Sequence, residues 1–277
     1  MLVDHHLHLE NRLGTDSAPD FQDPQPYVDQ GVRRDVGLFG FSDHAYIFDE
    51  AADINFNDWQ NERRHLALDD YVRAVEDFRG ICCSVLVGLE IDYAPHKEKE
   101  IGEFIQKCRN SYNFDFFIGS VHWIDDWGFD LDENEYNQRM HEMTSEKAFQ
   151  KYFTLVNNAI ESGLFQIIAH ADLIKIFNAR PSSELDIIAP TISLLKKHDQ
   201  AVEINTNGFN KPIGEQYPGL DFIRACVEAD IPLTLGSDAH TPDRVGENFD
   251  QIRTILDAFH VDKLAYFKKE GRRFVKI

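Results

Sequence analysis

The segment VDHHLHLE, Val3 to Glu10, places three histidines and two carboxylates within eight residues near the beginning of the chain. Alternate side chains of a β-strand point to the same face. One face is therefore expected to carry the polar set Asp4, His6, His8 and Glu10. The other face is expected to carry His5, Leu7 and Leu9. The polar set has the composition of a metal site, but the segment alone is equally typical of a buried strand with hydrogen-bonded histidines.

Seven short β-rich runs recur along the chain, and helical patterns lie between them. The predicted strands are Leu2–His6, Val36–Ser42, Ser84–Ile91, Phe114–Val121, Phe165–Ala169, Ala201–Asn205 and Ile231–Gly236. The predicted helices are Glu62–Phe78, Lys97–Asn110, Ser145–Ser162, Ile187–His198 and Leu220–Ala229. This alternation indicates parallel strands joined by right-handed crossovers. It predicts one α/β domain over residues 1–277, closed into a (β/α)7 barrel. An open doubly wound sheet is the alternative, but no glycine-rich phosphate loop follows the first strand.

The composition excludes several classes of partner. The formal net charge is −20, which disfavours binding to long nucleic acid and to an anionic membrane surface. The four cysteines have no CxxC spacing, which is typical of reduced thiols rather than of a disulfide framework. No apolar stretch has the length of a membrane span, and the N-terminus has no signal-peptide pattern. We therefore expect a cytoplasmic protein.

Residues that bind metals gather at the carboxyl ends of the predicted strands. These candidates are His6, His8, His44, Glu90, His122, His170, Glu203, Asn205, Asp238 and His240. Barrel enzymes build their sites at this end of the strands. Imidazole and carboxylate ligands without cysteine suit zinc, manganese or iron in a hydrolytic site. Because the set exceeds what one ion binds, we expect at least two ions, with Glu90 placed to bridge them.

The order of short motifs resembles the polymerase and histidinol phosphatase (PHP) superfamily. The matching segments are DHHLH (4–8), SDH (42–44), GLEIDY (88–93), IGSVHW (118–123), AHADLIK (169–175) and GSDAH (236–240). Two further stretches, GSVHWIDDWGFD (119–130) and EINTNGFNKPIGEQYP (203–218), are similar to the histidinol-phosphate phosphatase branch. The resemblance implies a distorted (β/α)7 barrel with a centre of two or three divalent metals.

The resemblance also implies a ligand set. A first ion would be held by His6, His8, Glu90 and Asp238. A second ion, bridged by Glu90, would be completed by His122 and His170. A third ion would be held by His44 and His240, with Glu10 in place of a loop histidine that this sequence lacks between His8 and His44; Asp16 is the weaker substitute.

The implied activity is hydrolysis of a phosphate monoester, typically L-histidinol phosphate, by a metal-activated hydroxide, as part of histidine biosynthesis. Glu90, Asp238 and His240 are the candidate catalytic residues, and Asp238, His240 or a metal-bound water would protonate the leaving alcohol. Lys175, Lys211 and, less strongly, Arg244 are candidates for binding the phosphate. We further expect Asp4 and Asp172 to orient ligand histidines, Asp43 to be a turn residue or a supporting acceptor, and the aromatic residues Trp123, Trp127 and Phe129 to line the pocket.

Three other functions compete with this hypothesis. The same chemistry would serve another small phosphate ester, a nucleotide or an oligonucleotide end. An amidohydrolase also carries an HxH pair on its first strand, but the segments LEIDY and SVHW contain no lysine for the modified ligand of that superfamily. A regulatory metal-binding scaffold is disfavoured by the nearly complete ligand set. The sequence leaves the oligomeric state and the identity of the metals open.

Overall fold

The fold is built on seven parallel strands. The structure is a computed structural model and describes residues 1–11 and 21–277. The strands are adjacent in the order β1-β2-β3-β4-β7-β8-β9. Their bounds are β1 Leu2–Leu7, β2 Val36–Phe41, β3 Val85–Asp92, β4 Phe116–Ser120, β7 Ile167–Ile168, β8 Ala201–Asn205 and β9 Leu233–Gly236. Past the end of β9, Ala239 forms a parallel bridge with Leu7. The first and last strands thus nearly close a barrel, which confirms the predicted α/β architecture.

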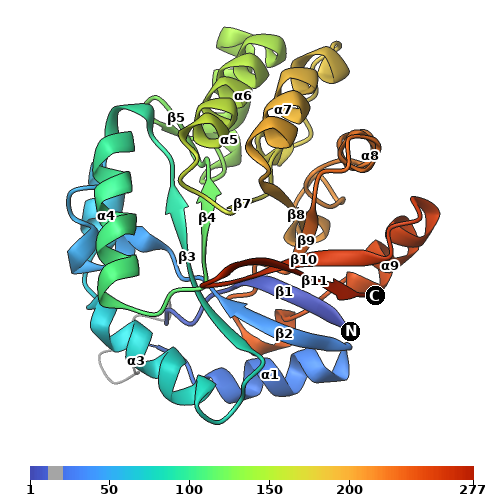
Figure 1. Ribbon diagram of the computed structural model, residues 1–277. Coiled ribbons are helices and arrows are strands. Elements are labelled where there is room, and N and C mark those ends of the chain that lie inside the picture. The colour runs from blue at the N-terminus through green and yellow to red at the C-terminus, as the bar shows by residue number, and fades with distance from the viewer. Residues whose placement is uncertain (12–20) are drawn as a thin grey trace.

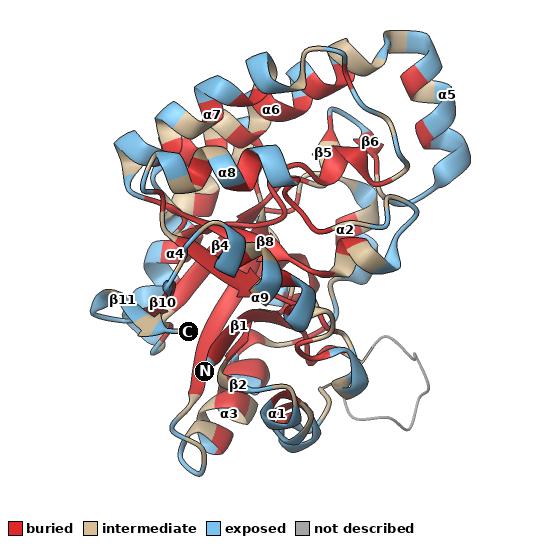
Figure 2. Ribbon diagram, turned by 90° about the vertical axis from the view of Figure 1, so that its right-hand side faces the viewer, coloured by how far each residue is buried: buried red, intermediate tan, exposed pale blue. Residues whose placement is uncertain are grey.

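Helices surround the strands on the outside (Figure 1). They are α1 Pro24–Arg33, α2 Asp58–Arg63, α3 Leu68–Arg79, α4 Glu98–Ser111, α5 Glu133–Met143, α6 Ser145–Ser162, α7 Glu184–His198, α8 Leu220–Glu228 and α9 Phe249–Ala258. Short 3-10 turns follow several strands: η1 Ala45–Ile47, η2 Asp49–Ala51, η3 Pro95–Lys97, η4 Leu173–Lys175, η5 Asn207–Asn210 and η6 Pro242–Arg244. Figure 2 shows buried residues concentrated on the strands, while the helices turn their exposed faces outward. This is the burial pattern of parallel strands that are covered on both faces.

The lower interior of the barrel is filled by a small apolar cluster. Its members are Leu86, Phe116, Ile118, Ile167, Ala169, Ala201, Ala265 and Phe267. Ala265 and Phe267 come from β10 Lys263–Lys268, which pairs antiparallel with β11 Gly271–Lys276. The hairpin therefore closes the base of the barrel, which leaves the opposite end, where the strands finish, for a site.

Two parts of the chain depart from the sequence-based expectation. The predicted helix Glu62–Phe78 is two helices, because the backbone N–H groups of His65 and Leu66 both donate to the carbonyl of Ile47 and interrupt the helical ladder. The pattern also missed α1, α5, α9 and the β10–β11 hairpin. A second small hairpin, β5 Trp123–Ile124 with β6 Trp127–Gly128, follows β4.

The first strand does not keep a strict alternation. Asp4 pairs with Phe39 and Leu7 with Phe41, so three steps along β1 match two steps along β2. An extra residue of this kind is a β-bulge, and it re-aims the side chains beside it. His5 consequently contacts the interior residues Phe116 and Phe267, although the alternation predicted that it would face away from His6.

Among the described residues, no helix is both long enough and apolar enough to cross a membrane.

Candidate metal centre

The strand ends meet at a cavity of about 470 Å³. Its lining includes most of the residues that the sequence predicted as metal ligands: Glu10, His44, Glu90, His122, His170, Asp238 and His240. His6 and His8 are fully buried, and both approach Glu90, which belongs to the lining. Ligand candidates from β1, β3 and the segments after β1, β2, β4, β7 and β9 are therefore brought to one place.

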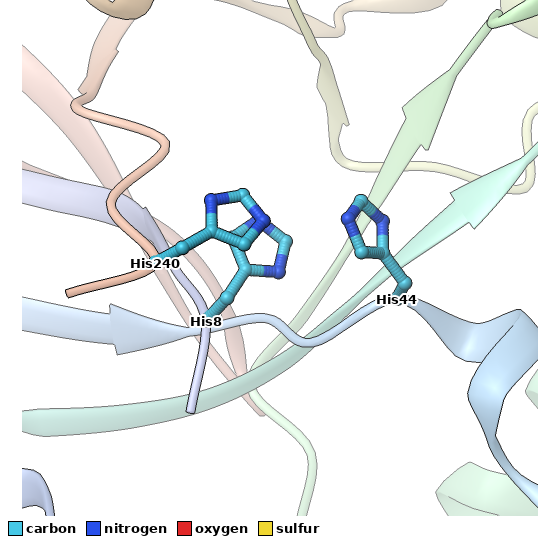
Figure 3. Close-up of side chains that lie close together, drawn as sticks. All are labelled: His8, His44 and His240. Carbon is cyan, nitrogen blue, oxygen red and sulfur yellow. The ribbon is translucent and has the colours of Figure 1, made fainter. Parts of the chain in front are cut away.

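Among residues 1–11 and 21–277, three groups of side chains are compact enough to hold an ion, with ligand atoms within 4.8 Å of one another. The groups are His6–Glu90–His170, His6–His8–Asp238 and His8–His44–His240. The third group is shown in Figure 3, where the rings of His8 and His240 lie against each other and the ring of His44 lies opposite them. His6 and His8 each belong to two groups, so the groups adjoin.

Glu90 lies at the centre of the cluster. Its Oε2 lies 3.1 Å from Nε2 of His6 and 2.8 Å from Nδ1 of His44. Its Oε1 lies 3.2 Å from Nε2 of His170 and 3.8 Å from Nε2 of His122. Because the two oxygens face different histidines, this carboxylate has the geometry of a bridge between two ions.

The backbone turns sharply at two of the candidate ligands. His170 has a φ of 26° and Asp238 a φ of 54°, so both adopt positive φ angles that non-glycine residues rarely occupy. Each follows directly on a β-strand region, where the turn swings the side chain over the strand ends. Strained backbone of this kind is maintained only where the surrounding structure enforces it, and it is common at functional sites.

The buried histidines and carboxylates perturb one another strongly. Burial opposes ionisation of Glu90, but His6 and His44 outweigh it and hold the pKa of Glu90 well below its usual value. Burial likewise opposes the charged ring of His6, yet Glu203 and Glu90 hold its pKa well above normal. Burial and the neighbouring His44 lower the pKa of His8 to about 4. Protonated histidines neutralise the carboxylates of this cluster in the same way as bound metal ions would. Metal ions and protons therefore compete for the same side chains.

The donor set fits a cation. Nε2 of His6 and Nε2 of His8 are buried and make no hydrogen bond to any of the described residues. Carboxylate oxygens nevertheless lie close, with Oε2 of Glu90 3.1 Å from the first nitrogen and Oδ1 of Asp238 3.4 Å from the second. Buried polar atoms normally find partners. Imidazole nitrogens and carboxylate oxygens converging in this way suit a divalent transition metal.

Glu203 supports the centre from below, a role that the sequence analysis did not assign. It is fully buried on β8, and its Oε1 lies 2.7 Å from Nδ1 of His6. Its Oε2 accepts hydrogen bonds from the backbone N–H of His170 (3.0 Å) and the side-chain amide of Asn205 (3.1 Å). The sequence does carry a signal for this role, because Glu203 is a carboxylate within an otherwise apolar parallel strand. Ligand histidines commonly bond such an acceptor through their second nitrogen.

Other supporting acids differ from expectation. Asp4, expected to orient a histidine, accepts instead from Ser237 and from the backbone N–H of Gly246. Asp172 likewise does not contact a ligand ring; it pairs with Lys175 at 2.8 Å and accepts from Gly219. Both carboxylates satisfy buried backbone N–H groups, which are costly to leave unpaired.

Asp43 and Asp92, two acids close to the metal centre, hold parts of it in position. Asp43 accepts from the backbone N–H groups of Leu9 and Glu10 and so fixes the end of the first strand. Asp92 bonds Nδ1 of His122, and it raises the pKa of that ring to about 10 against the effect of burial. Asp92 therefore orients a ligand candidate in the way that was expected of Asp172.

His5 takes no part in the candidate groups. Its Nδ1 lies 2.7 Å from the hydroxyl of Thr234, and its ring packs on Phe116. Burial lowers the pKa of His5 to about 3, so the ring is neutral. His5 is thus a packed residue rather than a ligand, and it lies below His6 inside the barrel instead of on the opposite face of the strand.

The candidate phosphate-binding cations have different positions. Lys175 is fully buried and bonds Asp172, Glu215 and the carbonyl of Gln216, and it is absent from the cavity lining. All three of its protons are used within the fold, so none is left for a phosphate. Arg244 is also outside the lining and pairs with Glu247 at the surface. Lys211 does line the cavity.

Several further residues of the cavity wall were not predicted. Arg63 lines it, with its guanidinium 3.7 Å from the centre of the Trp59 ring. Tyr46, Trp59 and Asp130 are also part of the lining, and so is Trp123, as expected. Trp127 and Phe129, expected beside Trp123, are instead buried in the core. Tyr46 lies on the η1 turn, and Trp59 and Arg63 lie on α2, of which only the last two residues fall within the predicted helix Glu62–Phe78.

The structure groups the predicted ligands of the third ion differently. Oε1 of Glu10 lies 3.9 Å from Nε2 of His240, and both side chains line the cavity. The structure groups His8, rather than Glu10, with His44 and His240. Asp16, the weaker substitute, lies outside the described residues.

The chain matches the family model of the PHP domain over residues 4–207. A protein of Deinococcus radiodurans named as a probable histidinol-phosphatase is 32% identical over 269 residues, which cover 92% of this chain and 93% of the relative. The histidinol-phosphatase of Lactococcus lactis is 22% identical over 274 residues, which cover 96% of this chain and 94% of the relative.

The fold has a solved counterpart. The crystal structure of histidinol phosphate phosphatase from Lactococcus lactis, in complex with zinc, L-histidinol and phosphate, superposes with a TM-score of 0.75. The alignment has 21% sequence identity and covers 98% of each chain. At this identity the likeness establishes the barrel fold.

Proposed function

This chain belongs to the PHP domain family, and on that premise we propose that it is a metal-dependent phosphomonoesterase that hydrolyses L-histidinol phosphate to L-histidinol and inorganic phosphate. Curated relatives that align over nearly its whole length are histidinol-phosphatases, which are phosphoric monoester hydrolases. The reaction is a step of histidine biosynthesis. The activity is carried by one domain of residues 1–277.

The observation that carries the proposal is the position of Glu90 between two sets of histidines at the base of an open cavity. One oxygen faces His6 and His44, and the other faces His170 and His122. Two ions a few ångströms apart supply an activated water and neutralise the oxygens of a phosphate, which is the chemistry of many phosphoesterases.

The proposed ligands follow from the groups in the structure. His6, His8, Glu90 and Asp238 would hold one ion, and Glu90, His122 and His170 a second. His44 and His240 would hold a third, together with Glu10 or with the shared His8. Zinc, iron and manganese all suit imidazole and carboxylate ligands, and zinc is the metal in the related crystal structure.

The remaining residues of the cavity act on the substrate. Lys211 and Arg63, which both line the cavity, hold the phosphate dianion by charge-assisted hydrogen bonds. Attack on phosphorus breaks the ester P–O bond, and the leaving oxygen takes a proton. Asp238 or His240 is the proton donor, since both lie on the segment after β9 and line the cavity.

A second candidate function keeps this chemistry and changes the substrate to another small phosphate ester or a nucleotide. The cavity volume of about 470 Å³ admits either class. The net charge of −20 disfavours long nucleic acid.

We propose the cytoplasm as the location, in keeping with four cysteines that form no disulfide.

The experiment is a phosphate-release screen. Metal-stripped protein is reconstituted separately with zinc, manganese and iron and then assayed against L-histidinol phosphate, nucleotides and simple phosphate esters. We expect metal-dependent turnover that is fastest for L-histidinol phosphate. Fast turnover of another ester with none of L-histidinol phosphate would overturn the substrate and leave the chemistry, whereas no metal-dependent release would overturn both.

A further inference from the structure

The cavity wall contains a carboxylate, Asp130, that has no role in the proposed reaction. Asp130 follows the β5–β6 hairpin and lines the cavity. The preceding Phe129 is fully buried and anchors the segment in the core. Oδ1 of Asp130 is buried and makes no hydrogen bond to any of the residues that the structure describes. A buried acceptor of this kind is costly unless a partner arrives.

Other acids around the cavity already have partners. Glu90 is surrounded by five histidines, and Asp238 lies beside His8. Asp92 accepts from the ring of His122 and from the side-chain amide of Gln60 at 2.9 Å. Asp130 has no such donor on Oδ1. Oδ1 of Asp130 is therefore left as an acceptor for whatever enters the cavity. Burial raises the pKa of Asp130, and an entering cation would favour its charged form.

We propose that Asp130 binds a cationic group on the alcohol part of the substrate, so that the cavity selects phosphate monoesters of amino alcohols. The inference rests on the proposed phosphatase function and adds the residue that chooses among its substrates. An ammonium group carries three donors and no acceptor, which complements an unpartnered carboxylate oxygen. The cations of the lining, Lys211 and Arg63, carry the charge that suits the phosphate rather than the ammonium group.

The surroundings of Asp130 suit the rest of such an alcohol. Trp123 precedes it on the same hairpin segment and lines the same cavity. The ring of Trp123 meets that of Trp59 edge-on at 5.7 Å, and Trp59 meets Tyr46 in the same way at 5.3 Å. Aromatic faces of this kind receive planar rings and cations. A substrate with a phosphate at the metal centre would thus place its organic part between this wall and Asp130.

The test compares esters that differ only in the amino group. L-histidinol phosphate is paired with its deaminated analogue, and 2-aminoethyl phosphate is paired with ethyl phosphate. The wild-type enzyme and Asp130→Asn are assayed on all four, and bound metal is measured in each protein. Asp126→Asn is the matched control, because Asp126 lies on the same hairpin, is exposed and does not line the cavity.

We expect wild type and Asp126→Asn to prefer the amino ester of each pair. In Asp130→Asn, kcat/KM for the amino esters should fall about 10- to 100-fold, the range for a hydrogen bond between charged groups. It should stay within about twofold for the esters without an amino group, and the metal content should not change.

Three results would overturn the inference: no preference for the amino esters in wild type, an equal fall on both members of a pair in Asp130→Asn, or loss of metal from that variant. The second pair separates this inference from the proposed function. If the enzyme rejects L-histidinol phosphate but prefers 2-aminoethyl phosphate over ethyl phosphate through Asp130, the proposed substrate is wrong and the role of Asp130 holds.

Discussion

Nδ1 of His6 lies 2.7 Å from Oε1 of Glu203, across 197 residues of sequence. Both side chains are fully buried. An imidazole that gives its Nδ1 proton to a carboxylate presents Nε2 as a lone pair, and the ring is held in one orientation. Nε2 of His6 is the atom that faces Glu90, so the contact sets the direction of a nitrogen shared by two candidate metal groups.

Glu203→Gln should weaken metal binding without removing the fold. The amide keeps the size of the side chain but loses the charge that fixes the tautomer of His6. Loss of such a partner typically lowers metal affinity about 10- to 100-fold. Competition with a chelator measures this metal affinity. Glu228→Gln, an exposed change at the end of α8, is the control, and equal affinities in the two variants would refute the role.

Gly236→Ala should damage the same contact from the neighbouring strand. A Cβ at Gly236 would lie 1.9 Å from Oε1 of Glu203 and 2.7 Å from Cβ of His6, so these side chains must move. Overpacking of this kind costs about 1–3 kcal/mol in the free energy of unfolding. Gly102→Ala in α4 meets only a contact at 3.4 Å and serves as the control. Denaturant titration and metal content of both variants provide the check, and an unchanged Gly236→Ala protein would contradict the packing argument.

Glu90→Gln should disturb more than one ion. A carboxamide offers a single oxygen ligand, so a side chain that bridges two metals cannot be replaced by it. We expect fewer metal equivalents per chain and a fall in phosphate release of at least about 100-fold, by analogy with loss of an essential charged ligand. Glu103→Gln, on the exposed face of α4, is the comparison. Full stoichiometry and full rate in Glu90→Gln would show that it is not a bridge.

Glu10→Ala tests the third ion. If Glu10 completes the site of His44 and His240, the variant should lose about one metal equivalent and keep the other two. Glu62→Ala, exposed on α2, should keep them all. Metal content that is the same in both variants would assign the third site to His8, which the structure already groups with His44 and His240.

Lys175 and Lys211 should respond oppositely to substitution by methionine. Lys175→Met leaves Asp172 and Glu215 without their buried partner, and breaking such a pair costs about 3–5 kcal/mol in unfolding free energy. Lys211→Met should leave stability nearly unchanged and raise KM roughly tenfold, because it lines the cavity and binds phosphate. Thermal unfolding and steady-state kinetics separate the two effects. A raised KM in stable Lys175→Met protein would restore the role predicted from the sequence.

The strands and the metal-binding residues at their ends were predictable because they depend on local pattern. Apolar runs of strand length, alternating with helical stretches, indicate parallel strands, and the carboxyl ends of parallel strands meet at one edge. All seven predicted strands are present, and His44, Glu90 and His170 meet although they are far apart in sequence.

What could not be predicted depends on distant partners. The bulge in β1 arises from its register with β2, so the local alternation gave the wrong side for His5. Lys175 looked like a phosphate ligand because its partner Glu215 is 40 residues away. The aromatic wall of Trp59 and Tyr46 comes from the short helix α2 and the η1 turn, whose positions are set by tertiary contacts and not by hydrophobic period.

The hairpin that fills the base of the barrel also sets an order of events in folding. Phe267 of β10 packs against His5 of β1, which joins the two ends of the polypeptide. Contacts of such long sequence separation carry a large loop-closure entropy and slow the folding of the domains that need them. Water should therefore leave the barrel floor late, after the outer helices have formed on their strands. Burial lowers the pKa of His5 to about 3 in the folded protein, so we expect the loss of its proton to report on the final closure.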